Sequence, residues 1–294
     1  MSRPRPPVRV VTDSTACLPV PDATDDGAGP VVVPLRVLAG DDAWREGVDV
    51  EPEQVAARIA AGDVLTTSQP PPEDFAGVFR DLAADGAGAV VSVHLSGALS
   101  GTVAAAEGAA QRAMVPVRAV DSGTVAMALG FAALEAARCA AAGHDAAAVA
   151  DRAVRVAASS RTVFLVESLE HLRRGGRLSA PAAALGTALG VRPILEVRDG
   201  GIELAQRVRT RRAATDRLID LGVRHAATCE RPGVAVHHLG VADRAEEVAA
   251  RLHERTGVEP VVTPVSAVLG AHAGPGALAV VVADLGEHTH PDTW

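Results

Sequence analysis

The 294-residue sequence contains no lysine, no tyrosine and no asparagine, so all 28 of its basic residues are arginine. Without lysine there is no Schiff-base amine, no Walker-type phosphate-binding lysine and no Ser-Lys nucleophile. Without asparagine a Cys-His-Asn triad cannot form. These absences exclude several classes of enzyme before any motif is considered.

Metal-binding and disulfide patterns are also missing from the sequence. The three cysteines lie far apart and form no CxxC pair, and the histidines form no HExxH motif. We therefore expect no metal site and no disulfide framework.

The sequence has no apolar run near the roughly 18 residues that a transmembrane helix needs. Its first residues, MSRPRPP, lack the apolar stretch of a signal peptide. We expect a cytoplasmic protein without stable membrane insertion, whose contact with membranes is transient at most.

The net charge of -8 argues against a general nucleic-acid binder, which is normally basic. Charge is nevertheless uneven along the chain. From Arg161 to Arg212 there are ten arginines against five acidic residues. This segment is compatible with a face for a negatively charged partner or with a merely solvated face.

The order of apolar runs and helical stretches predicts an α/β fold. In the first half, strands near residues 8–11, 89–93 and 115–120 alternate with helices, which indicates a parallel sheet between helical layers. The second half predicts a hairpin around Asp199-Gly200-Gly201 and a mixed sheet. We divide the chain into a disordered tail, an N-terminal α/β/α domain, a C-terminal α/β domain and a C-terminal tail, at residues 1–7, 8–158, 159–285 and 286–294.

Turns rich in hydroxyl or carboxylate groups follow four of the predicted strands: TDST (12–15), TTSQ (66–69), LSGALSGT (95–102) and DSG (121–123). In an open parallel sheet the carboxyl ends of the strands line the ligand crevice, and helix N-termini there add partial positive charge. Helix capping explains each turn singly, since Ser, Thr and Asp are preferred caps. Four such turns at one edge favour a site for an anion.

A serine nucleophile in these turns needs a base within hydrogen-bond reach. The sequence has no GxSxG elbow, but His272 is a candidate base for Ser96. Neither GxGxxG nor GxxxxGK[ST] occurs, so no standard phosphate-binding loop is present. The residues alone leave two readings open: an anionic small molecule bound between two α/β domains, or a serine esterase or acyl transferase using Ser96 and His272.

Eight motifs occur together in an order that resembles the DegV family of bacterial fatty-acid-binding proteins, over about residues 8–285. They are VTDSTACLP (11–19), TTSQPPPEDF (66–75), SGALSGTVAAA (96–106), VDSGTVAMALG (120–130), ESLEHLRRGGRLS (167–179), GVRPILEVRDGGI (190–202), RVRTRRAA (207–214) and AHAGPGALAV (271–280).

The resemblance implies a two-domain DegV-like fold that holds a long-chain fatty acid in an interdomain tunnel. It also implies a role like that of the fatty-acid-binding B subunit of fatty acid kinase. Such a protein is no enzyme and has no cofactor beyond the fatty acid. It presents the carboxylate to the kinase catalytic subunit, which forms an acyl phosphate for phospholipid synthesis. A regulatory protein that senses acyl chains would use the same pocket and stays open as an alternative.

The resemblance also assigns roles to individual residues. The carboxylate-binding residues are Thr67, Ser96, Gly97 and His272. The supporting residues are Arg177, Ser68, Asp13 and Ser14, although Asp13 and Ser14 are equally suited to shaping a turn. The arginines expected to dock the partner are Arg173, Arg174, Arg207 and Arg209. Ser100 and Thr102 are expected to cap the helix that follows them.

Overall fold

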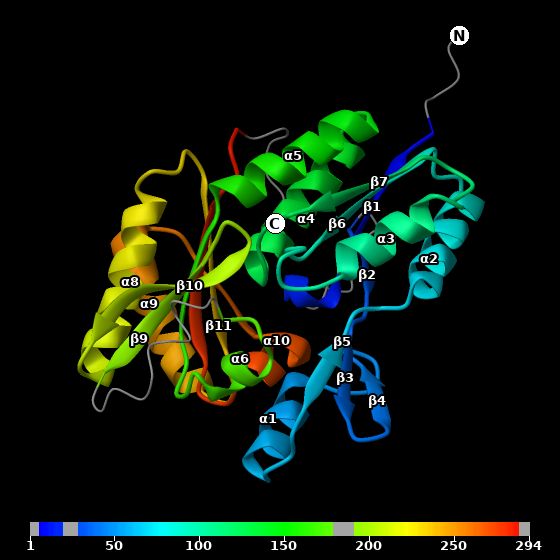
Figure 1. Cartoon of the computed structure of the whole chain (residues 1–294). Coiled ribbons are helices and arrows are strands. Elements are labelled where there is room, and N and C mark those ends of the chain that lie inside the picture. The colour runs from blue at the N-terminus through cyan, green and yellow to red at the C-terminus, as the bar shows by residue number, and fades with distance from the viewer. Residues whose placement is uncertain (1–5, 20–28, 179–190, 288–294) are drawn as a thin grey trace.

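The computed structural model describes residues 6–19, 29–178 and 191–287, and Figure 1 shows their arrangement. The described strands form three sheets of four, six and three strands. The predicted α/β class with a parallel and a mixed sheet is confirmed. Most of the predicted tails, residues 1–7 and 286–294, lies outside the described residues.

The four-stranded sheet is parallel, with strand order β2-β1-β6-β7. Its strands are β1 (Val8–Asp13), β2 (Val31–Val33), β6 (Ala89–His94) and β7 (Val117–Asp121). Successive strand residues point to opposite faces, so both faces of this Val-rich sheet can be buried. Val10 packs in the cluster that contains α4 (Met127–Ala141) and α5 (Ala146–Ser159). Val11 packs in the cluster that contains α2 (Pro72–Ala84) and α3 (Thr102–Ala110).

The six-stranded sheet is mixed, with strand order β10-β9-β8-β13-β11-β12. Every neighbouring pair is antiparallel except β11 with β12. Helices α8 (Arg211–Ala226) and α9 (Ala242–Thr256) cover its outer face, on the left in Figure 1. Its strands are β8 (Arg161–Leu165), β9 (Arg192–Arg198), β10 (Gly201–Val208), β11 (Pro232–His238), β12 (Val261–Pro264) and β13 (Leu278–Asp284).

The three-stranded sheet corrects one expectation. After β2 the chain passes Pro34 and forms β3 (Arg36–Ala39). The first three residues of the predicted turn TTSQ form β5 (Thr66–Ser68), which pairs antiparallel with β3. With β4 (Asp42–Arg45) and α1 (Pro52–Ala60), these strands form a small lobe at the bottom of Figure 1.

Two short α-helices lie beside this lobe, α6 (Glu170–Arg174) and α10 (Ala267–Ala273), and a 3₁₀ turn (Ser14–Ala16) follows β1. Helix α10 packs against α1, β3, β5 and α6. It was not predicted, because a seven-residue helix next to a Gly-Pro-Gly turn carries too little periodic signal. His272 therefore lies on a helix and not in a glycine-rich loop.

The largest apolar core runs from the parallel sheet through α4 and α5 to the six-stranded sheet, where Val281 and Ala283 join it. The predicted domain boundary after residue 158 falls at the C-terminal end of α5 and stays a prediction. No helix in the described ranges is long and apolar enough to cross a membrane.

Candidate functional site

A cavity of about 330 Å³ is lined by residues in or directly after strands of all three sheets. This volume lies in the range of roughly 300–1,000 Å³ typical of small-molecule pockets. Most of the wall is aliphatic, and among the described residues Phe164 is the one aromatic lining side chain apart from histidine. The apolar lining includes Leu35, Leu95, Leu99, Val125, Phe164, Leu172, Val197, Ile202, Val268, Leu269 and Leu278.

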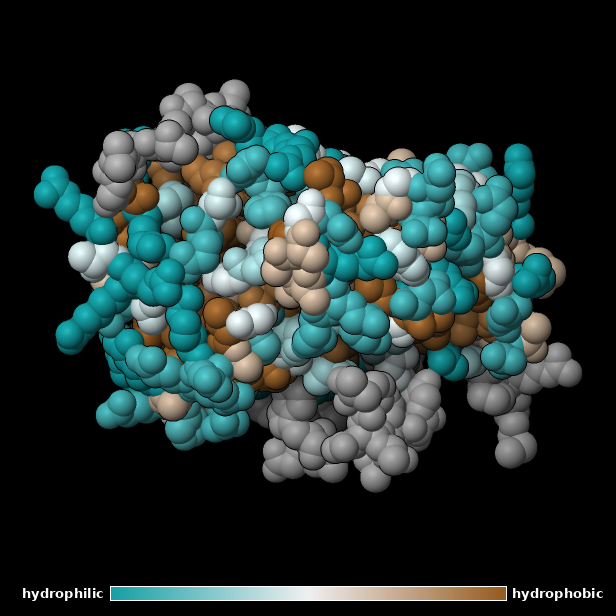
Figure 2. Space-filling model, turned by 90° about the horizontal axis from the view of Figure 1, so that it is seen from below, coloured by the Kyte–Doolittle hydropathy of each residue, from teal (hydrophilic) through white to brown (hydrophobic). Residues whose placement is uncertain are grey.

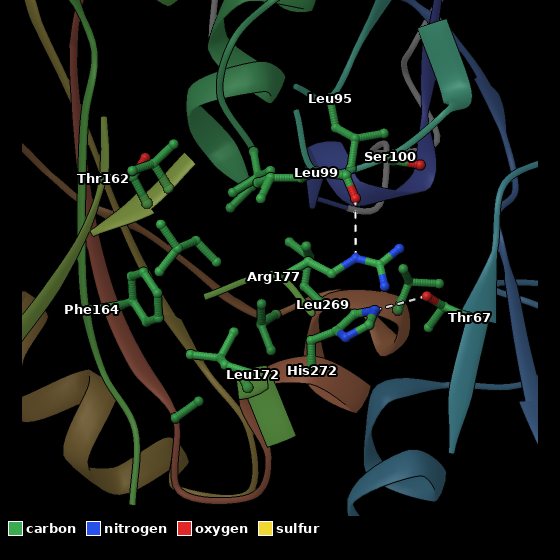
Figure 3. Close-up of a pocket in the computed structure, with 18 of the residues that line it drawn as sticks. Thr67, Leu95, Leu99, Ser100, Thr162, Phe164, Leu172, Arg177, Leu269 and His272 are labelled. Atoms are coloured by element: carbon green, nitrogen blue, oxygen red, sulfur yellow. Dashed lines mark hydrogen bonds between the residues drawn. The ribbon is translucent and has the colours of Figure 1, made fainter. Parts of the chain in front are cut away.

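The polar side chains gather at one end of this cavity. Thr67 on β5 and His272 on α10 form a hydrogen bond of 2.8 Å between Oγ1 and Nε2. Arg177 lies next to this pair, and its Nε donates to the Leu99 carbonyl at 3.2 Å. Figure 3 shows Thr67, Arg177 and His272 close together, with Phe164 on the opposite side of the pocket. The pocket therefore has a polar end and an apolar body.

The charge at the polar end comes from arginine. Burial, with the nearby Arg177 guanidinium, lowers the pKa of His272 to about 4. At neutral pH the imidazole is therefore uncharged and serves as a hydrogen-bond partner, while Arg177 supplies the positive charge. A Cβ at Gly175 would lie 2.3 Å from Nδ1 of His272, so the ring can occupy this place because residue 175 is glycine.

Ser96 and Gly97 do not line the cavity in this structure. The Ser96 side chain is buried, and its Oγ donates to the Gly200 carbonyl in the β9–β10 turn at 2.7 Å. The Gly97 N–H donates to the carboxylate of Asp121 at 3.1 Å. Their predicted contact with a ligand carboxylate stays a prediction, and it requires both groups to exchange these partners.

Ser100 and Gly101, from the second Ser-Gly pair of the same motif, do line the cavity. The expectation that Ser100 and Thr102 cap a helix is wrong, because Gly101 is the N-cap of α3 and no side chain caps it. A Cβ at Gly101 would lie 1.9 Å from Oε1 of Gln69, another lining residue. Sequence reasoning missed Ser100 and Gly101 as pocket residues because SGxxSG does not reveal which pair faces inward.

The predicted supporting residues separate into two groups. Ser68 lines the cavity beside Thr67. Asp13 and Ser14 lie away from it and hold turns together. Oγ of Ser14 donates to Glu46 at 2.6 Å and accepts the Leu35 N–H at 2.9 Å.

Asp13 belongs to a hydrogen-bonded Ser92-His94-Asp13 group that solvent does not reach. His94 Nδ1 lies 3.0 Å from Asp13 Oδ2, and its Nε2 lies 2.6 Å from Ser92 Oγ. All three residues are 0% exposed, and the ring of Phe75 packs edge-on against His94 at 5.0 Å. No substrate can reach these three residues in the folded protein, so they stabilise the core of the parallel sheet.

The four arginines expected to dock a partner are all exposed. Arg173 and Arg174 lie on α6, while Arg207 and Arg209 lie at the end of β10 and just beyond it. Arg174 pairs with Glu170 at 2.7 Å. Figure 2 shows that the side of the molecule formed by α8 and α9, on the left, is largely hydrophilic. The docking role of the four arginines stays a prediction.

Metal chemistry finds no support in the described part of the chain. Within residues 6–19, 29–178 and 191–287, no group of three or more His, Cys, Asp or Glu side chains is placed to hold a metal ion. The three cysteines are free thiols.

Fold and site together define an α/β protein with an apolar pocket that is polar at one end. A family model described as "Uncharacterised protein, DegV family" matches residues 7–285, and the chain belongs to this family. A DegV domain-containing protein of Streptomyces coelicolor is 44% identical over 277 residues, covering 94% of this chain and 98% of that protein. The predicted resemblance is confirmed.

Solved structures agree with this assignment. A fatty-acid-binding DegV family protein from Thermus thermophilus is 32% identical with a TM-score of 0.84, and the match covers 95% of this chain and 99% of that one. DegV from Bacillus subtilis, also a fatty-acid-binding protein, is 30% identical with a TM-score of 0.86 and the same coverage.

Proposed function

We propose that this protein binds a long-chain fatty acid in the cavity and presents its carboxylate to a partner kinase, without catalysing a reaction itself. The observation that carries the proposal is the gathering of Thr67, Arg177 and His272 at one end of an apolar pocket. The fatty-acid-binding relatives from Thermus and Bacillus support the same ligand class.

The carboxylate fits the polar end because that end offers a hydroxyl, a neutral imidazole and a guanidinium. Hydrogen bonds to a charged group contribute about 1.5–3 kcal/mol each. Ser100 and Gly101 face the same cavity, and Gly101 is the N-cap of α3, where a helix leaves its first backbone N–H groups unpaired. We assign these two residues to the headgroup site beside Thr67, His272 and Arg177.

The acyl tail fits the apolar body of the pocket. Each buried CH₂ contributes about 0.8 kcal/mol, so a sixteen-carbon tail offers on the order of 10 kcal/mol before the costs of association. The aliphatic wall around Leu99, Leu172 and Ile202 gives the tail no hydrogen-bond partner to satisfy. Affinity therefore comes mainly from the tail, and the polar end selects a carboxylate.

Mass spectrometry of the purified, denatured protein tests the ligand class. We expect a long-chain fatty acid at close to one molecule per chain. A delipidated protein should then take up added palmitate at the same stoichiometry. A protein that purifies empty and does not bind palmitate or oleate contradicts the proposal.

We propose that presentation takes place in the cytoplasm and serves phospholipid synthesis. A reconstituted reaction tests whether the protein presents its ligand to a kinase. Palmitate-loaded protein, the catalytic subunit of a fatty acid kinase and ATP should yield acyl phosphate. The exposed Arg207 and Arg209 would favour docking onto a kinase that holds a nucleotide. Replacing both by Glu should slow the reaction and leave palmitate affinity unchanged, while replacing both by Lys should have little effect. If the wild-type pair produces no acyl phosphate, presentation fails even where binding holds, and the acyl-chain-sensing role takes its place.

The serine esterase reading lacks a formed dyad. His272 pairs with Thr67, and Ser96 pairs with Gly200, so these two predicted partners are not hydrogen-bonded to each other. We expect no hydrolysis of short acyl esters such as p-nitrophenyl butyrate. Turnover that disappears in Ser96→Ala would restore the esterase.

A further inference from the structure

Glu46 is a buried carboxylate that lies where the three-stranded lobe meets α10. It directly follows β4, and its side chain is part of a residue only 5% exposed. Its backbone N–H donates to the Leu35 carbonyl at 2.9 Å, which fixes it to the lobe. No arginine or histidine among the described residues forms an ion pair with it, so hydrogen bonds alone must stabilise its charge.

Those hydrogen bonds come from two other segments of the chain. Ser14, directly after β1, donates to Oε2 at 2.6 Å, and the backbone N–H of Val268 donates to Oε1 at 3.3 Å. Burial raises the pKa of Glu46, and hydrogen bonds from Ser14, Ser266 and the first amides of α10 oppose that rise. At the same junction, the N–H of Ser266 donates to the buried sulfur of Cys17 at 3.2 Å.

The segments joined by Glu46 are the ones that form the polar end of the pocket. The lobe carries Thr67, which pairs with Val37 of β3, and α10 carries His272. The hydrogen bond between Thr67 and His272 crosses the interface that Glu46 closes. Helix α10 also contributes Val268 and Leu269 to the pocket wall. A shift of α10 against the lobe would therefore move the headgroup site and one wall together.

We propose that Glu46 is a positioning residue that sets the spacing of Thr67 and His272 for the ligand carboxylate. It touches no ligand itself and acts through the amides of α10. A glutamine at this place brings an NH₂ donor toward groups that are themselves donors, the Ser14 hydroxyl and the α10 amides. Loss of even one of these bonds leaves a buried group without its partner. This inference rests on fatty-acid binding as proposed above.

The matched variants are Glu46→Gln and Glu135→Gln, because Glu135 is also a buried carboxylate but lies away from the cavity. It is 1% exposed and binds Arg138, Arg152 and Arg231, none of which lines the cavity. Both variants should unfold at lower urea concentration than wild type. Only Glu46→Gln should bind palmitate more weakly, by about tenfold, equivalent to about 1.4 kcal/mol.

A comparison of two ligands separates positioning from general loss of structure. Affinities for palmitate and for 1-hexadecanol, which lacks the carboxylate, are measured for all three proteins. Glu46→Gln should lose palmitate affinity and keep hexadecanol affinity within about twofold. Equal losses for both ligands, or wild-type palmitate affinity, overturn the inference. If wild type itself does not bind palmitate, the proposed function fails instead.

Ser14→Ala decides the question if Glu46→Gln does not fold. It removes one hydrogen bond to Glu46 and keeps the carboxylate. A palmitate affinity about threefold or more below wild type, with hexadecanol affinity retained, supports the inference. Unchanged palmitate affinity overturns it.

Discussion

His94 and His272 each have a hydroxyl partner, but their roles are entirely different. His94 bonds to Ser92 and Asp13 inside the parallel sheet, where all three residues are 0% exposed. His272 bonds to Thr67 at the end of a cavity and lies beside Arg177. The first group has the composition of a hydrolase triad but no access, whereas the second has access but no nucleophile-activating carboxylate. Access and neighbouring charge, more than residue type, assign the chemistry.

Removal of Asp13 should give the largest effect on this comparison. Its carboxylate accepts hydrogen bonds from Thr15 N and Oγ1, from Leu95 N and from the His94 ring. Asp13→Ala leaves several buried groups unpaired and should cost about 3–5 kcal/mol of unfolding free energy, measured in urea. Asp121→Ala is the control, because Asp121 also binds backbone N–H groups but is exposed. Equal losses in the two variants contradict the buried role of Asp13.

Acid should reduce the stability that His272 contributes to the folded protein. Because the folded-state pKa of His272 is lowered to about 4, the unfolded chain, with a pKa near 6.5, binds the proton first. Stability from this group is complete above pH about 6.5 and falls as pH drops toward 4, by up to about 3 kcal/mol. His237, whose pKa burial also lowers to about 4, adds to the same slope. The free energy of unfolding in urea should be measured at several pH values between 7 and 4.5. Its dependence on pH should be less steep for His272→Gln than for wild type, and an equal dependence in the two proteins would contradict this explanation.

The Ser92 hydroxyl in the buried Ser92-His94-Asp13 group should affect stability alone. Ser92→Ala leaves Nε2 of His94 without its partner and should cost about 1–2 kcal/mol of unfolding free energy. Palmitate affinity, measured by titration of the delipidated protein, should match wild type. A loss of affinity without loss of stability would reverse the roles we assign to the two histidine groups.

The Thr67 hydroxyl in the pocket should instead affect ligand affinity. Thr67→Val preserves side-chain shape and removes the hydroxyl that we propose binds the ligand carboxylate, so palmitate affinity should fall about tenfold. The same change removes the part-buried hydrogen bond to His272, which should cost no more stability than Ser92→Ala does. Thr66→Val, on the exposed neighbour in β5, is the control and should bind like wild type. If both variants bind palmitate equally, Thr67 is no part of the headgroup site.

The sequence was informative where local chemistry dictates structure. Val-rich runs at residues 8–11 and 89–93 predict the central strands of the parallel sheet, because both faces of such strands are buried. Thr67, His272 and Arg177 were predicted together from separate motifs, and the structure brings them to one end of a cavity. The resemblance to the DegV family carried this prediction, since nothing in periodicity links residues 67 and 272.

The features that the sequence did not predict depend on tertiary contacts. Strand β5 is three residues of Thr and Ser, which read locally as a turn, and only pairing with β3 makes it a strand. The choice between Ser96 and Ser100 is made by the β9–β10 turn, whose Gly200 carbonyl holds Ser96 away from the cavity. Glu46 stands in a polar stretch, and its burial follows from the docking of α10.

The bond between Ser266 and Cys17 gives this protein a built-in chemical reporter. Burial raises the pKa of the Cys17 thiol, so neither the thiolate nor access for a reagent is available while α10 stays docked. Alkylation at Cys17 therefore measures how often the segment that follows β1 separates from the start of α10, on the timescale of local opening. The natural sequence can thus be used, without any attached dye, to measure the opening of this junction.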